Sequence, residues 1–206
     1  IGVGVGVSAT TEATPVVGQD SAPTTTWHIE TTGGLIGSVS VFDSTVFVGS
    51  LDGVVYAINA STGDIRWEYD TGERIESSPT VHNDRVYIGS DTGNLYSLDA
   101  TSGTEQWVFS TGRFVSSSPT VADDTVYVGS IDDNLYAIDA ASGDQQWAFE
   151  TGSGIFASPS IVDGTVYIAS FDGNLYAIDA ASGDQQWVFE RDRPLYSSPT
   201  IQSGSV

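Results

Sequence analysis

Three residue types are missing from this chain of 206 residues: cysteine, methionine and lysine. Without cysteine there is no disulfide framework, no thiol nucleophile and no zinc site with cysteine ligands. A chain that begins at Ile1 and contains no methionine is expected to be a processed or truncated product. Its 39% hydrophobic and 11% aromatic residues are nevertheless enough for one sizeable globular domain with a core.

Positive charge is scarce as well, because six arginines face 27 acidic residues and the formal net charge is −21. A polyphosphate or an anionic membrane would be repelled over most of such a surface, so we expect no nucleic-acid partner. Self-repulsion destabilises a compact chain in dilute salt, but at about 1 M salt the screening length falls to about 3 Å. The composition favours a halophilic source of the haloarchaeal kind. An ordinary acidic secreted protein is the other interpretation, since acidity also aids solubility.

Residues 1–26 are predicted to lie outside the folded domain. They open with the Gly/Val run IGVGVGVSA, which resembles the end of a secretory signal and its small-residue cleavage site. This run is too short to span a bilayer, so no membrane span is expected in this segment. The Thr/Pro/Ala stretch that follows has no apolar period and is typical of a flexible linker. We therefore expect an exported protein, extracellular or at the cell surface, whose folded domain covers residues 27–206.

From residue 27 onward the sequence repeats every forty residues without an insertion or deletion. Each unit contains four short runs of alternating apolar and polar residues, rich in Val, Ile, Tyr and Thr and separated by Gly/Asp turn signals. In the third unit these runs are VSSSPTV (115–121), TVYVGS (125–130), NLYAIDA (134–140) and QQWAFET (145–151). Each unit is therefore predicted to be a four-stranded antiparallel meander, with Pro119 at the start of its innermost strand.

A four-stranded unit of this size cannot bury both of its faces alone, and radial stacking into a β-propeller is the usual solution. We predict an all-β fold with about four complete blades of 40 residues each. Partial blades are expected at both ends: a lone outer strand around Trp27 and an inner strand at 197–202.

One pattern in the repeats is specific: Ala-x-Asp-x-x-Thr/Ser-Gly-x-x-x-Trp, as in Ala137, Asp139, Ser142, Gly143 and Trp147. It resembles the tryptophan-docking motif of the PQQ-like β-propeller family, which includes quinoprotein dehydrogenases and BamB-like assembly factors. The resemblance implies that each tryptophan packs against the turn glycine of a neighbouring blade and donates its indole N–H to a backbone carbonyl. The docking residues are then Trp27, Gly63, Trp67, Gly103, Trp107, Gly143, Trp147, Gly183 and Trp187.

The motif is not uniform. The first unit has Asn59 in place of the aspartate, and the second has Ser97 in place of the alanine. Members of the family generally have seven or eight blades, so the resemblance implies that this chain is an incomplete propeller.

The resemblance also indicates what quinoprotein chemistry would require, namely a disulfide of adjacent cysteines, a tryptophan stacked inside the ring and a calcium ion held by Glu, Asn and Asp. Here cysteine is absent and all five tryptophans occupy docking positions. We therefore predict no cofactor, no catalytic residue and no metal ligand, and PQQ or calcium would need ligands from blades outside this chain. His28 and His82 are expected to be solvated loop residues rather than ligands or bases.

Aspartates recur in the turns at 52–53, 132–133 and 172–173, which raises the possibility of calcium. A calcium loop needs several oxygen ligands at alternate positions, whereas these turns offer one or two. The sequence favours two-residue hairpin turns that require a positive φ.

The arginines are unevenly distributed. In a propeller, the connection from an outer strand to the next inner strand lies on the same face as the hairpin between the second and third strands. Four of the six arginines fall in those connections, together with three aromatic residues: Arg74, Arg113, Arg191 and Arg193, with Phe114, Phe156 and Tyr196. Arginine and aromatic side chains are common interface anchors, so this face is predicted to bind a protein or an acidic polymer. Alternatively, these arginines only relieve crowding among the acidic residues.

Three functions are compatible with the sequence. The favoured one is an exported, non-catalytic scaffold that binds a protein, a peptide or a surface polymer on the face that carries the arginines. The second is part of a PQQ-dependent quinoprotein dehydrogenase whose catalytic residues lie outside this segment. The third is the sensor domain of a membrane kinase, which would require a hydrophobic span elsewhere.

Overall fold

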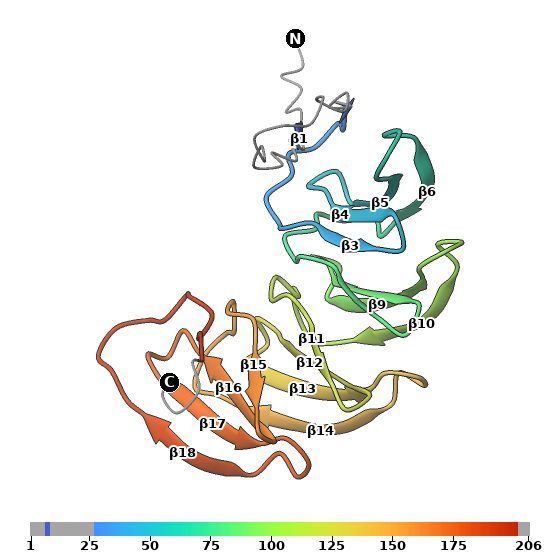
Figure 1. The fold of residues 1–206 in the computed structure, drawn as a ribbon. Coiled ribbons are helices and arrows are strands. Elements are labelled where there is room, and N and C mark those ends of the chain that lie inside the picture. Colours follow the sequence, from blue (N-terminus) through green and yellow to red (C-terminus); the bar gives the residue numbers. More distant parts are fainter. Residues whose placement is uncertain (1–6, 9–26, 202–206) are drawn as a thin grey trace, which may run out of the picture.

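The computed structural model describes residues 7–8 and 27–201, and within these residues it contains strands and no helix (Figure 1). Four antiparallel sheets of four strands each follow one another along an open arc, and within each sheet the strands pair in the order of the sequence. The predicted all-β propeller of four-stranded blades is therefore confirmed. We number the sheets as blades 1 to 4.

The strand bounds repeat almost without change from blade to blade. Blade 1 consists of β3 (Ser40–Phe42), β4 (Thr45–Gly49), β5 (Val54–Asn59) and β6 (Ile65–Asp70). Blade 2 consists of β7 (Thr80–His82), β8 (Arg85–Gly89), β9 (Asn94–Asp99) and β10 (Glu105–Ser110). Blade 3 consists of β11 (Thr120–Ala122), β12 (Thr125–Gly129), β13 (Asn134–Asp139) and β14 (Gln145–Glu150). Blade 4 consists of β15 (Ser160–Val162), β16 (Thr165–Ala169), β17 (Leu175–Asp179) and β18 (Gln185–Phe189).

The innermost strands are shorter than the sequence predicts. The run at 115–121 was expected to be a strand, but β11 begins only at Thr120, after Pro119. Pro119 has no N–H to donate, and the N–H of Ser118 bonds sideways to Ser158 Oγ at 3.0 Å instead of joining a ladder. The strand therefore starts where ladder bonds first become possible.

The ends of the chain differ from the prediction in two ways. Trp27 is followed by β2 (His28–Ile29), which pairs with β1 (Val7–Ser8) and with no strand of blades 1 to 4. The inner strand predicted at 197–202 is not formed over 197–201, because no strand in the described part of the chain pairs with this segment. Residues 1–6, 9–26 and 202–206 lie outside the described residues, so the predicted leader and linker stay predictions.

The predicted positive φ is present at Gly53, Asp133 and Gly173, at 90°, 75° and 92°, but the two-residue turns lie elsewhere. They join the first and second strands of each blade, as at Asp123 and Asp124, whose φ angles are 46° and 56°. The turns that contain Asp52-Gly53 and its equivalents are loops between the second and third strands, of four residues in blades 1 to 3 and five in blade 4. His82 is the last residue of β7, not a turn residue as predicted.

The hydrophobic core lies between the blades. One cluster of buried residues, for example, joins Leu135 and Trp147 of blade 3 to Ile168 and Ile178 of blade 4. The outer strands are mostly exposed and bury mainly their tryptophan, as the alternation in β14 shows. Each blade is therefore stabilised by contact with the next rather than by a core of its own.

Glycines at the end of the second strands allow the connections to pack closely on the blades. A Cβ built on Gly129 would lie 2.2 Å from the side chain of Ile155, which is fully buried in the next connection. Gly49 and Gly89 meet Ile75 and Val115 in the same way.

Candidate binding face

The predicted binding residues lie on one face of the arc, which we call the loop face. It consists of the loops between second and third strands and of the connections between blades: 50–53, 90–93, 130–133 and 170–173, with 71–79, 111–119, 151–159 and 190–199. Backbone bonds tie each connection to the loop of its own blade, as from Thr71 N to Gly53 O at 2.9 Å. They also tie it to the next blade, as from Asp91 N to Arg74 O at 2.9 Å. The predicted arrangement of loops and connections on a single face is therefore present.

Aspartate carboxylates fix the loops of this face. In blade 3, Asp132 accepts hydrogen bonds from the backbone N–H of Asn134 at 3.1 Å, the hydroxyl of Tyr136 at 2.7 Å and the N–H of Gly112 at 2.6 Å. Asp172 and Asp52 make the corresponding contacts in blades 4 and 1. These aspartates therefore hold the loop, its own blade and the preceding connection together, which is a structural role that the sequence did not reveal.

The phenols bound to these carboxylates are held in their neutral form. Burial and the hydrogen bond to Asp52 raise the pKa of Tyr56 to about 12. The pKa of Tyr136 is raised in the same way by burial and by Asp132. Both phenols therefore stay protonated near neutral pH and can donate to the carboxylates.

The four arginines of the loop face are all exposed. Arg74 lies in the connection from blade 1 to blade 2, Arg113 in the next one, and Arg191 and Arg193 in the segment after β18. None of their guanidinium groups makes a hydrogen bond or an ion pair with residues 27–201; the one ion pair found there joins His82 to Asp124. They are therefore free to contact a ligand from solvent.

Three aromatic rings cluster on the loop at 170–173 and the two connections around it, one of which is the segment that carries Arg191 and Arg193. Phe156 lies 5.9 Å from Phe171 and 6.0 Å from Tyr196, and Phe171 lies 5.1 Å from Tyr196, measured between ring centroids. Tyr196 is 62% exposed and Phe156 is 37% exposed. Phe156 and Tyr196 are predicted from the sequence as binding residues, whereas Phe171 is not. Its loop-tip position holds Leu51, Asp91 and Ile131 in the other blades, so only a repeat-by-repeat comparison of that position would have found it.

The structure does not gather all of the predicted residues into one site. Arg113 and Phe114 lie one connection away from Arg74, and Phe114 is 51% exposed without a ring partner. Arg74 is flanked by Glu73, Glu76 and Asp91, and the pKa of Asp91 is raised by its burial and by Glu76. The predicted binding residues are thus most concentrated in the aromatic cluster and the segment with Arg191 and Arg193. Arg74 belongs to a more acidic part of the loop face.

The tryptophans join the blades on the opposite face and are not part of the loop face. The indole N–H of Trp67 donates to Ala100 O at 3.0 Å, that of Trp107 to Ala140 O at 3.1 Å and that of Trp147 to Ala180 O at 3.0 Å. Trp27 makes the same bond to Ala60 O at 2.9 Å.

Each indole covers the turn glycine of the next blade. A Cβ on Gly103, Gly143 or Gly183 would lie within 2.8 Å of the ring. Gly63 meets Trp27 in the same way. Trp187 has no such turn to cover within the described residues and is 39% exposed.

The described residues do not fit PQQ or its calcium ion. Four of the five tryptophans are held between blades by their indole bonds, so none of these four is available to stack inside the ring. Among residues 7–8 and 27–201 no group of three or more His, Cys, Asp or Glu side chains is placed to hold a metal ion. No step involving this cofactor is therefore derived for the chain.

Known structures place this architecture in a class. BamB from Moraxella catarrhalis is similar over 79% of this chain, with 28% sequence identity and a TM-score of 0.71. The quinohemoprotein alcohol dehydrogenase of Comamonas testosteroni and the computationally designed Ika8 protein share the fold, with TM-scores of 0.70 and 0.72 at 18% and 17% identity over 79% and 80% of this chain. The chain is a β-propeller of the PQQ-like kind.

A family model defines it further. Residues 19–206 match the family described as "Beta-alanine-activating enzyme, beta-propeller", and the chain belongs to that family. The matching stretch covers 52% of BamB and of Ika8 and 35% of the alcohol dehydrogenase, so the chain spans about half of these relatives or less. No curated protein matches the chain. In its described residues there is no helix long and apolar enough to cross a membrane.

Proposed function

We propose that this chain is an exported, non-catalytic β-propeller scaffold whose loop face binds a protein, a peptide or an acidic surface polymer. The observation that carries the proposal is the set of exposed guanidinium groups that have no protein partner within residues 27–201. Two of them belong to the segment whose backbone packs on the loop that carries Phe171. Guanidinium groups bind carboxylates in a bidentate manner, and aromatic rings supply apolar contact area at low entropic cost. The Gly/Val run at the N-terminus supports the export part of the proposal.

The ligand class follows from the chemistry of the loop face. A net charge of −21 repels anions at long range, so an acidic ligand needs close contact with the arginines or screening by salt. The segment around Arg191 and Arg193 offers both cations and rings within one connection and one loop. We infer that an acidic peptide with an aromatic or aliphatic residue is bound better than a purely acidic polymer.

Binding of a fluorescent acidic peptide, followed by anisotropy in molar KCl, tests the proposal. Replacing Arg74, Arg113, Arg191 or Arg193 by alanine is expected to weaken binding by about 1 to 3 kcal/mol each while changing stability little. Arg66→Ala is the matched control, because it removes the same charge from an outer strand. A fourfold Arg→Lys variant keeps the charge and separates guanidinium recognition from simple attraction.

The natural partner can be sought with the same proteins. Wild-type and fourfold Arg→Ala proteins are used to recover partners from the surface fraction of the source organism. The proposal predicts a partner that only the wild type retains. Identical recovery by both proteins, together with equal peptide binding by Arg191→Ala and Arg66→Ala, would remove the arginines from any binding role.

A further inference from the structure

A hollow lies between blades 3 and 4 on the face opposite to the loop face, which we call the turn face. Its volume is about 500 Å³. Thr125 and Gln146 of blade 3 line one side, and Asp179 with the backbone of Ala180 and Ala181 lines the other. The turn residues Asp123 and Asp163 complete the rim.

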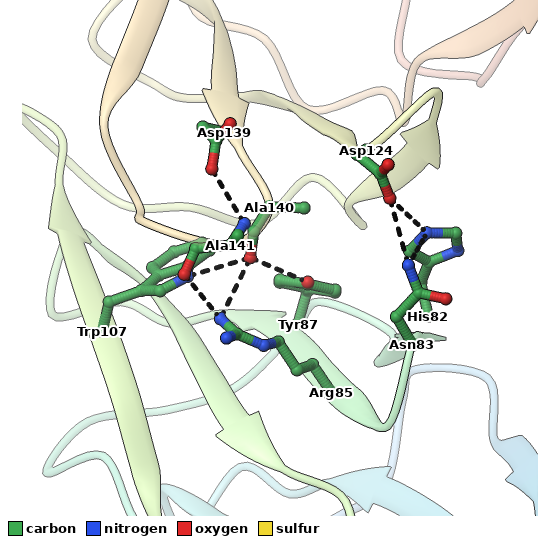
Figure 2. Close-up of polar contacts among 9 residues, drawn as sticks. All are labelled: His82, Asn83, Arg85, Tyr87, Trp107, Asp124, Asp139, Ala140 and Ala141. Carbon is green, nitrogen blue, oxygen red and sulfur yellow. Dashed lines mark hydrogen bonds and ion pairs between the residues drawn. The ribbon is translucent and has the colours of Figure 1, made fainter.

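The equivalent place between blades 2 and 3 is occupied by a side chain of the protein itself. Arg85, one repeat before Thr125, donates from Nη1 to Ala140 O at 3.1 Å and to Ala141 O at 2.9 Å (Figure 2). Ala140 O also accepts the hydroxyl of Tyr87 at 3.1 Å and the indole N–H of Trp107 at 3.1 Å. At this interface the carbonyl oxygens of the docking turn are therefore bound by a guanidinium group of the chain itself.

In blade 1 a different arginine lies next to the equivalent position. Thr45 stands at the position of Arg85, and Arg66 of β6 donates to its hydroxyl at 2.7 Å. Arg66 is the extra residue of the bulge that precedes the docking tryptophan, since Ile65 pairs with Ile58 and Trp67 with Ala57. Arg85 therefore reaches the docking turn of the next blade, whereas the bond of Arg66 lies within blade 1.

The interface between blades 3 and 4 has neither arginine. The position of Arg85 is Thr125 and the bulge residue is Gln146, and these two side chains bond to each other at 3.2 Å. The hydroxyl of Tyr127 and the indole of Trp147 still donate to Ala180 O, at 3.1 and 3.0 Å. The docking turn is therefore built as in the preceding interface, and only the guanidinium group is missing.

The charges around the hollow are uncompensated. Its lining includes three aspartates and no cationic side chain. Hydrogen bonds from the backbone N–H groups of Ser182 and Ala181 lower the pKa of Asp179, which is therefore ionised at neutral pH. Within residues 27–201 no hydrogen bond to Ala181 O is present, whereas the corresponding Ala141 O accepts one from Arg85.

We propose that the hollow between blades 3 and 4 binds a guanidinium group, as an arginine side chain of a partner protein, in the place that Arg85 occupies one interface earlier. The ligand donates to the carbonyl oxygens of Ala180 and Ala181 and pairs with the rim aspartates. A guanidinium group suits this site better than an ammonium group, because it is planar, less strongly hydrated and able to donate in several directions at once. The site is on the turn face and does not depend on the arginines of the loop face.

The test uses N-acetyl-L-arginine methylamide as the probe and N-acetyl-L-lysine methylamide as the matched control, with binding followed by NMR titration at constant ionic strength. One arginine probe is expected to bind per chain, and the lysine probe about tenfold more weakly. Thr125→Arg fills the hollow from within and is expected to abolish binding. Arg85→Thr opens the hollow between blades 2 and 3 and is expected to add a second probe site.

Asp163→Asn keeps the positive φ of 49° that the turn requires and removes one rim charge, so it is expected to weaken binding without unfolding the protein. It replaces Arg85→Thr as the test if that variant does not fold. Unchanged binding by Thr125→Arg, equal binding of the two probes, or loss of both probes on adding KCl alone would each overturn the proposal. The fourfold Arg→Ala variant of the loop face serves as a control and is expected to bind the arginine probe like the wild type.

Discussion

At the residue scale, the docking tryptophans differ in how many other side chains donate to the same backbone carbonyl. Ala100 O accepts the indole of Trp67, and the ring beneath it is Phe47, which has no hydroxyl. Ala140 O keeps Tyr87 and Arg85 as donors when Trp107 is removed. The same motif therefore tolerates substitution differently in adjacent blades.

Trp67→Phe is expected to destabilise the protein more than Trp107→Phe, by about 1 kcal/mol, because only the first leaves a buried carbonyl without a side-chain donor. Both variants lose similar apolar area, so their difference isolates the hydrogen bond. Urea unfolding in molar KCl measures it. Equal losses would show that the indole N–H contributes nothing beyond packing.

Ser97 is the departure from the motif that has a structural consequence. Its hydroxyl is fully buried and has no hydrogen-bond partner, whereas the other three blades have Ala57, Ala137 and Ala177 at this position. A buried, unpaired hydroxyl costs about 1 to 3 kcal/mol. The residue that the motif prefers should therefore be more stable here.

Ser97→Ala is expected to raise the melting temperature, with an increase in unfolding free energy of about 1 kcal/mol. Ala137→Ser in the next blade is the reciprocal variant and should lower stability. A stabilising effect of Ala137→Ser, or a loss on Ser97→Ala, would contradict the assignment of this position as apolar.

At the scale of elements, the sequence predicted the blades better than the bounds of their inner strands. Period, alternation and the tryptophan register predicted the blades, and three of the four strands in each blade follow the alternating runs closely. The inner strand was predicted too long because VSSSPTV has a strand-like composition. Its serines instead bond sideways, from one inner segment to the next, as from Ser78 N to Ser118 Oγ at 2.9 Å. Such lateral bonds depend on the curvature of the ring, which no local pattern contains.

The loop face illustrates the same limit. The sequence predicted which connections carry arginine, because order along the chain decides the face on which a loop lies. It did not predict that Phe171 joins Phe156 and Tyr196, nor that Arg85 bonds to the docking turn of the next blade. These relations join residues from different repeats, and only the packing of one blade on the next brings them together.

The docking turn requires glycine for two separate reasons, a positive φ angle and the close approach of an indole ring. Gly143 has a φ of 79°, and its Cβ would lie 2.7 Å from the ring of Trp107. Gly164 has a similar φ of 72°, but nothing lies within 4 Å of its Cβ position. The pair separates backbone strain from the tryptophan contact.

Gly164→Ala is expected to cost about 1 kcal/mol through backbone strain alone, and Gly143→Ala clearly more, in the range of 2 to 4 kcal/mol, about the cost of overpacking added to that strain. Thermal unfolding of both variants under the same salt conditions provides the comparison. If Gly143→Ala cost no more than Gly164→Ala, the tryptophan would not depend on the glycine.

At the scale of the whole molecule, charge repulsion opposes folding. The chain carries 27 acidic residues against six arginines, and none of its arginines forms an ion pair within the part that the structure describes. Raising KCl from dilute buffer to about 1 M shortens the screening length from tens of ångströms to about 3 Å. The melting temperature is therefore expected to rise steeply over this range. A melting temperature independent of KCl would contradict the halophilic interpretation of the composition.

The central claim is that the loop face is the binding surface, and hydrogen exchange with and without a saturating acidic peptide tests it most directly. Protection is predicted in the connections at 71–79, 111–119 and 151–159 and in the segment at 190–196. The two-residue turns of the turn face should exchange at unchanged rates. The Arg66→Ala variant should show the same peptide-dependent protection as the wild type. Protection confined to the turn face, or unchanged exchange throughout with the peptide bound, would contradict the account.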